Sequence, residues 1–307
     1  MKYLVTGGAG FIGGHLCEAL LKQGHQVRVL DNLSTGKHEN LPPGVVLVEA
    51  DFRDLEAIRF AFHGINGVFH VGALPRVPYS VEFPAETSEA NIMGTVNVLV
   101  AARDAGVKRV VYSASSSAYG DQERLPMHPD MTPNPLNPYA LQKYVGELWM
   151  KQFAALYGLE TVSLRYFNVY GPRMANEGAY VTVMAIFLRQ RLAGESLTIE
   201  GDGLQTRDFT HVSDVVRANL LAMKSTQVGK GEVLNVGAGD AHSVKEIAEL
   251  IGGPVTYKER RKGDAKATLA DISRTRELIG WEPRVKFADG LRELIEQRTR
   301  TSEPSLT

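Results

Sequence analysis

The sequence of 307 residues contains one cysteine and has almost no net charge. A lone thiol, Cys17, cannot form a disulfide within the chain, and its apolar helical surroundings predict a buried, unreactive group in a reducing compartment. The net charge is −1, from 34 basic and 35 acidic residues. Since a nearly neutral chain has no strong field for a polyanion, nucleic acid is not expected as a partner.

Long hydrophobic runs are also missing. The amino-terminal apolar run is too short for a signal peptide. The longest later run covers residues 180–188, far short of the ~20 residues that a membrane span needs. We therefore expect no membrane partner and a cytoplasmic location. The eight histidines show no metal-ligand spacing, so no metal is expected either.

Apolar runs alternate with helical patterns along the first half of the chain. Residues 27–30, 67–71 and 107–113 are typical of strands, and residues 11–21 and 90–102 have helical spacing. The strands are mainly apolar and lack a strict alternation of apolar and polar residues, which indicates a parallel sheet covered by helices on both faces. The sequence thus predicts a doubly wound α/β fold.

This rhythm loosens after residue 165, where shorter elements predict a smaller second lobe. We expect residues 1–170 to form the larger domain, with residues 207–236 interleaved into it. Residues 171–206 and 237–298 are assigned to the smaller lobe, and the polar tail 299–307 is expected to be flexible.

A glycine-rich segment follows the first predicted strand and opens the first helix. Gly7, Gly10 and Gly13 allow a tight turn, a close approach to a pyrophosphate and close helix packing, while the helix amino terminus supplies free N–H groups. Such a motif alone often marks only a flexible turn. Here the strand, turn and helix are all in place and Asp31 ends the second strand, so a dinucleotide site is predicted.

Asp31 also indicates which dinucleotide is bound. A carboxylate at this position accepts hydrogen bonds from both ribose hydroxyls and repels a 2′-phosphate, which favours NAD over NADP. Asp51 and Phe52, after the third strand, are candidates to hold the adenine.

A second candidate site is Tyr139 with Lys143. Asn137 is a plausible N-cap with Pro138 at the first helical position, which places the two side chains on one helix face. Tyrosine is a weak base at neutral pH unless nearby positive charge favours the phenolate, and Lys143 supplies such a charge. Because a tyrosine and a lysine four apart also occur by chance in many helices, this pair carries weight only together with other sites.

A serine-rich turn, residues 113–120, follows the predicted central strand. Ligands of doubly wound folds lie outside the carboxyl ends of the strands, so Ser115 is placed to share a hydrogen bond with a substrate hydroxyl and Tyr139. A plain serine-rich turn is the alternative. A serine nucleophile is disfavoured because this turn has no G-x-S-x-G elbow.

Together these motifs resemble the extended short-chain dehydrogenase/reductase family, whose nucleotide-sugar members share the TGGxGFIG loop, a Ser or Thr, and YxxxK. Four distal segments strengthen the resemblance, which covers residues 3–294: LRYFNVYGPR at 164–173, GDGLQTRDF at 201–209, RKGD at 261–264, and ADIS with GWEP at 270–283. The resemblance implies a Rossmann domain, tightly bound NAD and a nucleotide sugar between the lobes.

The resemblance also implies residue roles. Ser115, Tyr139 and Lys143 would be catalytic. The residues expected to bind the cofactor are Gly7, Gly10, Phe11, Ile12, Gly13, Asp31, Asn32, Ser34, Thr35, Gly36, Asp51, Phe52, Val71, Gly72, Ala73, Asn91, Ser113, Tyr139, Lys143 and Phe167. The residues expected to bind the substrate are Ser115, Asn168, Val183, Thr198, Glu200, Arg207, Arg261, Asp264 and Thr268. Arginine forks match phosphate oxygens, and a carboxylate bridges vicinal hydroxyls.

The reaction class follows from two positions. Related dehydratases and decarboxylases carry carboxylates directly after the catalytic Ser or Thr, whereas this chain has Ser116 and Ser117. The resemblance therefore implies 4-epimerisation of UDP-hexoses through a 4-keto intermediate. The alternatives are a nucleotide-sugar 4,6-dehydratase, a 4-ketoreductase, and a non-catalytic NAD-binding regulator.

Two finer expectations concern the substrate and the partner. Thr268 aligns with a pocket-wall position that is bulky in epimerases restricted to plain hexoses, so UDP-GlcNAc and UDP-GalNAc are expected substrates beside UDP-glucose and UDP-galactose. The apolar faces of the helices at 90–102 and 139–157 agree with the homodimer that the resemblance implies.

Overall fold

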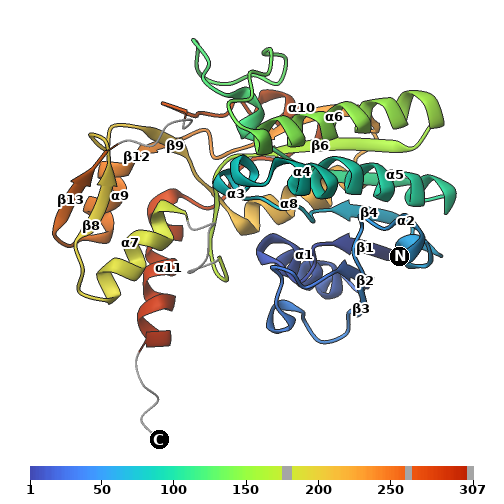
Figure 1. The fold of residues 1–307 in the computed structure, drawn as a ribbon, viewed down its shortest axis with the longest axis horizontal. Helices are drawn as coiled ribbons and strands as arrows, with labels where there is room; N and C mark the ends of the chain where they lie inside the picture. The colour runs from blue at the N-terminus through green and yellow to red at the C-terminus, as the bar shows by residue number, and fades with distance from the viewer. Residues whose placement is uncertain (175–181, 260–264, 303–307) are drawn as a thin grey trace, which may run out of the picture.

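The structure is a computed structural model that describes residues 1–174, 182–259 and 265–302. A large lobe is built around a seven-stranded sheet, and a smaller lobe lies at one end of it (Figure 1). The larger sheet has the strand order β11-β6-β5-β4-β1-β2-β3, and every neighbouring pair is parallel. The strands are β1 (Lys2–Thr6), β2 (Gln26–Asp31), β3 (Val46–Glu49), β4 (Gly67–His70), β5 (Arg109–Ser115), β6 (Glu160–Tyr166) and β11 (Lys230–Val236).

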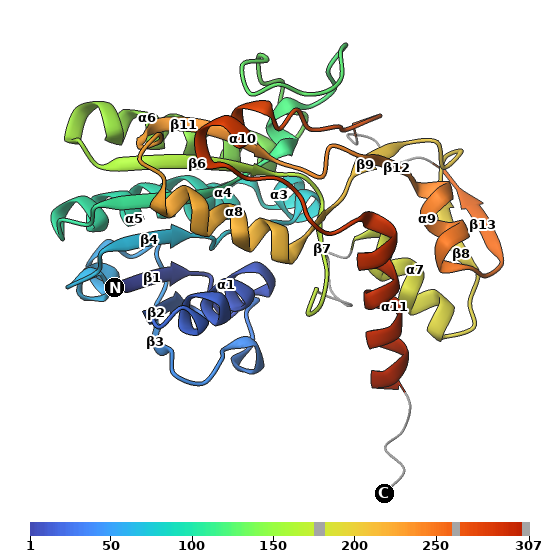
Figure 2. The ribbon, with the colours of Figure 1, turned by 180° about the vertical axis from the view of Figure 1, so that it is seen from behind.

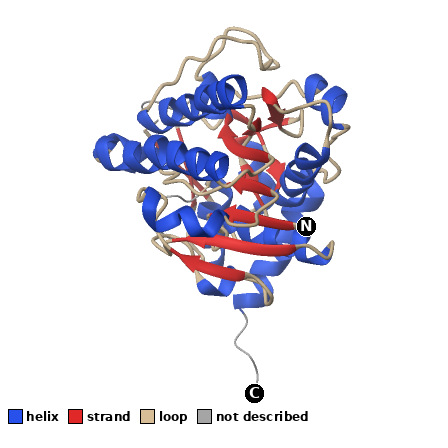
Figure 3. Cartoon of the chain, turned by 90° about the vertical axis from the view of Figure 1, so that its right-hand side faces the viewer, coloured by secondary structure: helices blue, strands red, loops and turns tan. Residues whose placement is uncertain are grey.

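Helices cover both faces of this sheet (Figure 2 and Figure 3). One face carries α1 (Phe11–Lys22), α8 (Val212–Lys224) and α10 (Ser273–Ile279). The other carries α2 (Leu55–Ile58), η2 (Arg59–Phe62), α5 (Gly94–Asp104) and α6 (Pro138–Tyr157). This arrangement confirms the predicted doubly wound fold.

The apolar strands explain the two layers. Consecutive side chains of a strand point to opposite faces, so Leu4 packs under the α5 and α6 layer while Val5 packs under α1 and α8. Both residues have no exposed surface. Cys17 lies in the α1 layer, where burial raises the pKa of its thiol to about 12 and leaves it unreactive at neutral pH.

The strand order reverses between β1 and β4, and loops diverge there to opposite sides of the sheet. In doubly wound folds this reversal opens a crevice at the carboxyl ends of the strands. Four short elements follow β4 and β5 around the crevice: α3 (Val77–Glu82), α4 (Pro84–Ser88), the π-helical turn η3 (Glu89–Met93) and the turn η4 (Ser116–Tyr119). A further turn, η1 (His38–Asn40), follows β2.

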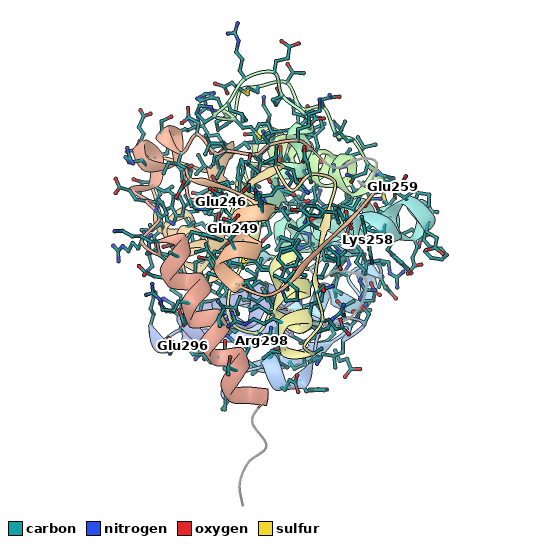
Figure 4. The ribbon with its side chains drawn as sticks, turned by 90° about the vertical axis from the view of Figure 1, so that its left-hand side faces the viewer. Glu246, Glu249, Lys258, Glu259, Glu296 and Arg298 are labelled. Carbon is teal, nitrogen blue, oxygen red and sulfur yellow. The ribbon has the colours of Figure 1, made fainter. Side chains whose placement is uncertain are left out.

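The smaller lobe consists of short paired strands and three helices. Its strand pairs are β8 (Leu197–Glu200) with β13 (Val255–Lys258) and β9 (Thr206–Asp208) with β12 (Ala241–Ser243), and β7 (Val169–Tyr170) pairs with β10 (Thr210–His211) where the lobes join. The helices are α7 (Val183–Leu192), α9 (Val244–Ile251) and α11 (Phe287–Ser302). Figure 4 shows the outer side of this lobe, with Glu246 and Glu249 on α9 and Glu296 on α11.

The described residues differ from the sequence expectations in two places. Helix α10 and Trp281 belong to the range assigned to the smaller lobe, but they pack against α8 and β11 in the core of the large lobe. The tail expected to be flexible from residue 299 continues as α11 to Ser302. Among the described helices, none combines the length and apolar character that a bilayer span requires.

Candidate active site

The glycine-rich loop joins β1 to α1 at the point where the strand order reverses. Gly7 has a φ of +67°, and a Cβ atom added there would lie 2.6 Å from the Cα atom of Gly72 after β4. A Cβ atom on Gly13 would overlap the carbonyl group of Gly7. The loop is therefore closed by backbone on backbone, and the N-cap residue of α1, Gly10, makes no side-chain hydrogen bond to the first turn.

Asp31 ends β2 and faces this loop. Its carboxylate is 7% exposed and accepts hydrogen bonds from the N–H groups of Ala9 and Leu33, both at 2.9 Å. These bonds fix the carboxylate at the end of the strand and leave it acceptor capacity for ribose hydroxyls.

A buried histidine connects the loop to the neighbouring helix. His70 Nδ1 lies 2.7 Å from Thr6 Oγ1, and His70 Nε2 lies 2.9 Å from Thr95 Oγ1. Thr6 Oγ1 also accepts the N–H of Gly72 at 3.1 Å. Burial lowers the pKa of His70 to about 3, so a neutral imidazole links the ends of β1 and β4 to α5.

Ser115 ends β5 and caps the turn η4. Its Oγ lies 2.8 Å from Ser117 Oγ and accepts the N–H of Ser117 at 3.2 Å. Ser116 and Ser117 line the same cavity as Ser115, so serine hydroxyls stand at the two positions discussed above.

Helix α6 begins as predicted. Asn137 accepts the N–H of Ala140 at 2.9 Å, and Pro138 occupies the first turn. The N–H of Tyr139 donates to Ser80 Oγ of α3 at 3.1 Å, which anchors the start of the helix. Tyr139 and Lys143, one turn apart, both line the cavity.

Lys143 is only 3% exposed. Burial lowers its pKa to about 7, and the negative charge of Glu147 on the next turn of α6 acts in the opposite direction. The Nζ atom of Lys143 lies 4.7 Å from the ring centroid of Tyr112 on β5. Glu147 is itself engaged by Arg165 of β6 in two hydrogen bonds of 2.8 and 2.7 Å.

The smaller lobe closes the other side of the cavity. Asn168, with a φ of +20°, donates to the carbonyl oxygen of Asp208 at 3.0 Å, and the N–H of Asp208 donates to Thr268 Oγ1 at 3.2 Å. The Asp208 carboxylate accepts three backbone N–H groups, from Ala238, Gly239 and Ala270, although burial still raises its pKa to about 6. This carboxylate holds together the segments that carry the pocket wall.

One cavity of about 600 Å³ brings most of the predicted residues together. It is lined by Gly7, Gly10, Phe11, Ile12, Gly13, Asp31, Asn32, Ser34, Thr35, Gly36, Asp51, Phe52, Val71, Gly72, Ala73, Ser113, Ser115, Tyr139, Lys143, Asn168, Arg207 and Thr268. The cofactor half and the substrate half therefore form one continuous space.

Five predicted residues lie outside this lining. Asn91 is 2% exposed and binds both backbone groups of Leu74, at 2.8 and 3.0 Å, so it supports a cavity wall from behind. Phe167 is fully buried in a small apolar cluster with Tyr119 and Met127. Val183, Thr198 and Glu200 lie on α7 and β8 outside the lining.

Thr198 exchanges hydrogen bonds with Gln190 of α7, at 2.8 and 3.0 Å. Arg261 and Asp264, and the segment 175–181, lie outside the described residues.

Sequence reasoning missed three residues that hold the site: Ser80, Tyr112 and Asp208. Asp208 belongs to the quoted RDF segment, so that segment was the available signal for it. Ser80 and Tyr112 had no signal, because their importance depends on contacts with α6.

The cradle fits a dinucleotide. It is lined by three glycines whose added Cβ atoms would lie within 3.2 Å of neighbouring backbone and by the first turn of α1, and a fixed carboxylate stands at the end of β2. These groups are the anion-binding and ribose-binding elements that NAD requires.

Comparison with known proteins agrees with this geometry. Residues 3–237 match the family model described as the NAD dependent epimerase/dehydratase family. The chain belongs to this family, which confirms the resemblance inferred from its motifs.

Three relatives are similar over nearly their whole length. The putative UDP-glucose 4-epimerase of Methanocaldococcus jannaschii is 38% identical, with 95% of this chain and 96% of the relative covered. The UDP-glucose 4-epimerase of Thermotoga maritima, solved with UDP-glucose, is 40% identical and has a TM-score of 0.94, covering 99% of this chain and 100% of its own. The UDP-N-acetylglucosamine 4-epimerase of Methanobrevibacter ruminantium M1, in complex with UDP-N-acetylmuramic acid, is 36% identical with a TM-score of 0.92 and covers 98% of both chains.

Proposed function

We propose that this protein is an NAD-dependent 4-epimerase that interconverts UDP-glucose and UDP-galactose. The observation that carries the proposal is the single cavity in which Ser115, Tyr139 and Lys143 stand beside the glycine cradle. Serines 116 and 117 line it where a dehydratase or decarboxylase would need a carboxylate. The full-length similarity to UDP-glucose 4-epimerases supports the same activity.

NAD, when bound, supplies the acceptor and donor of the hydride at carbon 4 of the sugar. Tyr139 Oη takes the proton of the 4-hydroxyl group and later returns it, with the Ser115 hydroxyl sharing that hydrogen bond. The charge of Lys143 favours the phenolate of Tyr139. The transient 4-keto sugar then rotates in the cavity. Return of the hydride to its opposite face inverts the configuration at carbon 4.

The substrate is held by its diphosphate, so the hexose is free to rotate. Arg207 lines the cavity, and its Nη1 atom donates to the carbonyl oxygen of Thr206 at 2.9 Å, which orients the guanidinium. We assign Arg207 and Asn168 to the diphosphate, as the family motif implies. From their motif alone, Arg261 is assigned to the diphosphate and Asp264 to the uridine ribose.

The same cavity also suits an N-acetylated hexose. Thr268 is a small wall residue, and its hydroxyl is already engaged by the N–H of Asp208 at 3.2 Å, so no bulky group stands there. The similarity to a UDP-N-acetylglucosamine 4-epimerase supports this extension. Turnover of UDP-GlcNAc tests it, and a Thr268→Tyr variant should lose that activity while keeping conversion of UDP-glucose.

The larger lobe acts as the cofactor domain and the smaller lobe as the substrate domain. We also propose a homodimer through α5 and α6, because α6 exposes Leu148 (45%), Trp149 (37%) and Leu156 (69%) on its surface. Sedimentation of the wild type and of Leu148→Glu tests this: the variant should be monomeric. The cytoplasmic location stays a prediction.

The activity is tested with purified protein, added NAD and a panel of nucleotide sugars, with product stereochemistry determined by NMR. Tyr139→Phe should lower conversion by about 10²–10⁴-fold, the usual contribution of a general acid–base group, while NAD still binds. Tyr144→Phe, on the same helix but outside the cavity lining, is the matched control and should keep wild-type rates.

The alternatives give different outcomes. A 4-keto product that accumulates indicates a dehydratase, and stoichiometric consumption of NADH indicates a ketoreductase. NAD binding without conversion of any nucleotide sugar indicates a regulator. Wild-type rates in Tyr139→Phe would show that Tyr139 does not carry out the proton transfer.

A further inference from the structure

Tyr112 lies beneath the predicted catalytic lysine without touching the cavity. It is on β5, has no exposed surface and does not belong to the cavity lining. The Nζ atom of Lys143 stands 4.7 Å from the centroid of its ring, within the range of a cation–π contact. The imidazole of His70 stacks on the same tyrosine at 5.5 Å with an interplanar angle of 30°.

The position of this ring depends on a glycine in α6. A Cβ atom added to Gly146 would lie 2.6 Å from Tyr112 Cζ and still closer to the hydroxyl oxygen. A glycine in the middle of a helix is destabilising relative to alanine, and here it makes room for the phenol. Tyr112 Oη donates to the carbonyl oxygen of Lys143 at 3.5 Å, so the tyrosine also contacts the backbone of the lysine.

Lys143 needs favourable contacts to stay charged. Its burial penalises the ammonium form, and the carboxylate that faces it, Glu147, is shared with Arg165, which binds both carboxylate oxygens. The negative face of an aromatic ring attracts a desolvated cation more strongly than one in water. The ring of Tyr112 is therefore a second source of stabilisation for the ammonium group.

We propose that Tyr112 is a positioning residue that holds Lys143 in its charged form beside Tyr139. This inference rests on the proposed function only for its effect on catalysis. Its effect on the lysine is independent of the reaction. Because Tyr112 is buried outside the cavity lining, it acts through the lysine.

The titratable groups around Lys143 come from several elements. On α6 they are Tyr139 and Glu147, on β5 Tyr112, on β4 His70, on β6 Arg165 and on η4 Tyr119, while Glu82 of α3 and Glu89 of η3 are exposed. Burial keeps His70 neutral and raises the pKa of Tyr112 well above its usual value. Of the packed groups named here, Lys143 is therefore the one whose charge near neutral pH is most directly affected by the ring of Tyr112.

The direct test is the ionisation of Lys143 in the NAD-saturated protein. Lysine labelled with ¹³C at the ε-carbon is titrated by NMR, and the Lys143 signal is assigned by its loss in Lys143→Met. Tyr112→Met keeps most of the side-chain volume but removes the aromatic face, and it should lower the pKa of Lys143 by about one unit. Tyr112→Phe keeps the face and should restore the wild-type titration to within a few tenths of a unit.

The pH profile of kcat gives a second measurement. Activity requires the charged lysine, so the alkaline limb should move to lower pH in Tyr112→Met and return in Tyr112→Phe. An unchanged Lys143 titration in Tyr112→Met overturns the proposal, even where kcat falls uniformly at every pH. Tyr112→Leu serves in the same way where the methionine variant does not fold.

The two proposals fail separately. A shifted Lys143 titration in a protein without epimerase activity leaves the positioning role intact and removes the proposed function. An active epimerase in which Tyr112→Met leaves the Lys143 titration unchanged removes the positioning role and keeps the proposed function.

Discussion

The buried pair of Glu147 and Arg165 offers a sharp test of how the large lobe is stabilised. Its side chains are 3% and 2% exposed and are joined by two parallel hydrogen bonds of 2.8 and 2.7 Å. Burial opposes the charge of Arg165, but its bonds to Glu147 outweigh this effect and hold its pKa above the usual range. The guanidinium also lies 4.3 Å from the ring centroid of Tyr119.

The cost of breaking this pair follows from what is left behind. Glu147→Gln keeps the shape but leaves a buried cation without a countercharge, and the Nη1 atom of Arg165 already has no hydrogen-bond partner. Removing one partner of a buried pair costs about 3–5 kcal/mol. For a chain of this size, such a loss lowers the melting temperature by roughly 5–15 °C.

Thermal and urea unfolding measure this effect, with two further variants as references. Glu282→Gln breaks the pair with Arg276, whose side chains are both 59% exposed, and should cost less than about 1 kcal/mol. The double variant Glu147→Leu/Arg165→Met removes both charges and should recover most of the loss. A cost below about 1 kcal/mol for Glu147→Gln would show that the ion pair is solvated or dispensable.

Two other predictions concern the cofactor side. Since burial lowers the folded-state pKa of His70 to about 3, its contribution to stability is complete above about pH 6.5 and is lost as the pH falls, by up to about 1.4 kcal/mol per pH unit. In unfolding experiments, His70→Gln should flatten the acid-side dependence of the free energy of unfolding on pH, whereas His63→Gln, at an exposed position, should not. Equal slopes in the wild type and both variants would contradict the buried neutral imidazole. Gly13→Ala places a methyl group against the Gly7 carbonyl and should weaken NAD binding roughly 10–100-fold, measured by fluorescence titration, while unfolding stays cooperative. Wild-type affinity would show that the loop does not close as described.

The parts of the fold that could be predicted are those with a local pattern. Strands β4 and β5 are buried on both faces, so their mainly apolar sequences without polar alternation identified a central parallel sheet. The start of α6 was readable because Asn137 and Pro138 form a local cap. The short helices α3 and α4 have a proline in the first turn but no side-chain N-cap. The polar composition of α11 made its last turn look like a flexible tail.

The predicted residues line the cavity where a motif carries them and lie outside it where packing decides their position. Asp31, Ser115 and the residues of the glycine loop are placed by strand ends, whose positions follow from the fold. Thr198 and Glu200 occupy a four-residue strand of the smaller lobe, and Thr198 is bonded to Gln190 of α7, whose packing against this strand the sequence does not show. The direction of a short strand's side chains depends on such tertiary contacts.

Glycines that leave room for aromatic rings explain why the remaining contacts could not be predicted from the sequence. A Cβ atom on Gly146 would overlap Tyr112, one on Gly94 would overlap Phe52, and one on Gly290 would overlap Tyr170. Each pair joins positions far apart in the chain, so a glycine in the sequence reveals neither the space it leaves nor the ring that fills it. Two of these rings border the proposed active site, Phe52 in the cofactor cavity and Tyr112 under Lys143. An added methyl group at Gly146 or Gly94 should therefore disturb the active site from outside the cavity, whereas one at Gly290 should act on the smaller lobe.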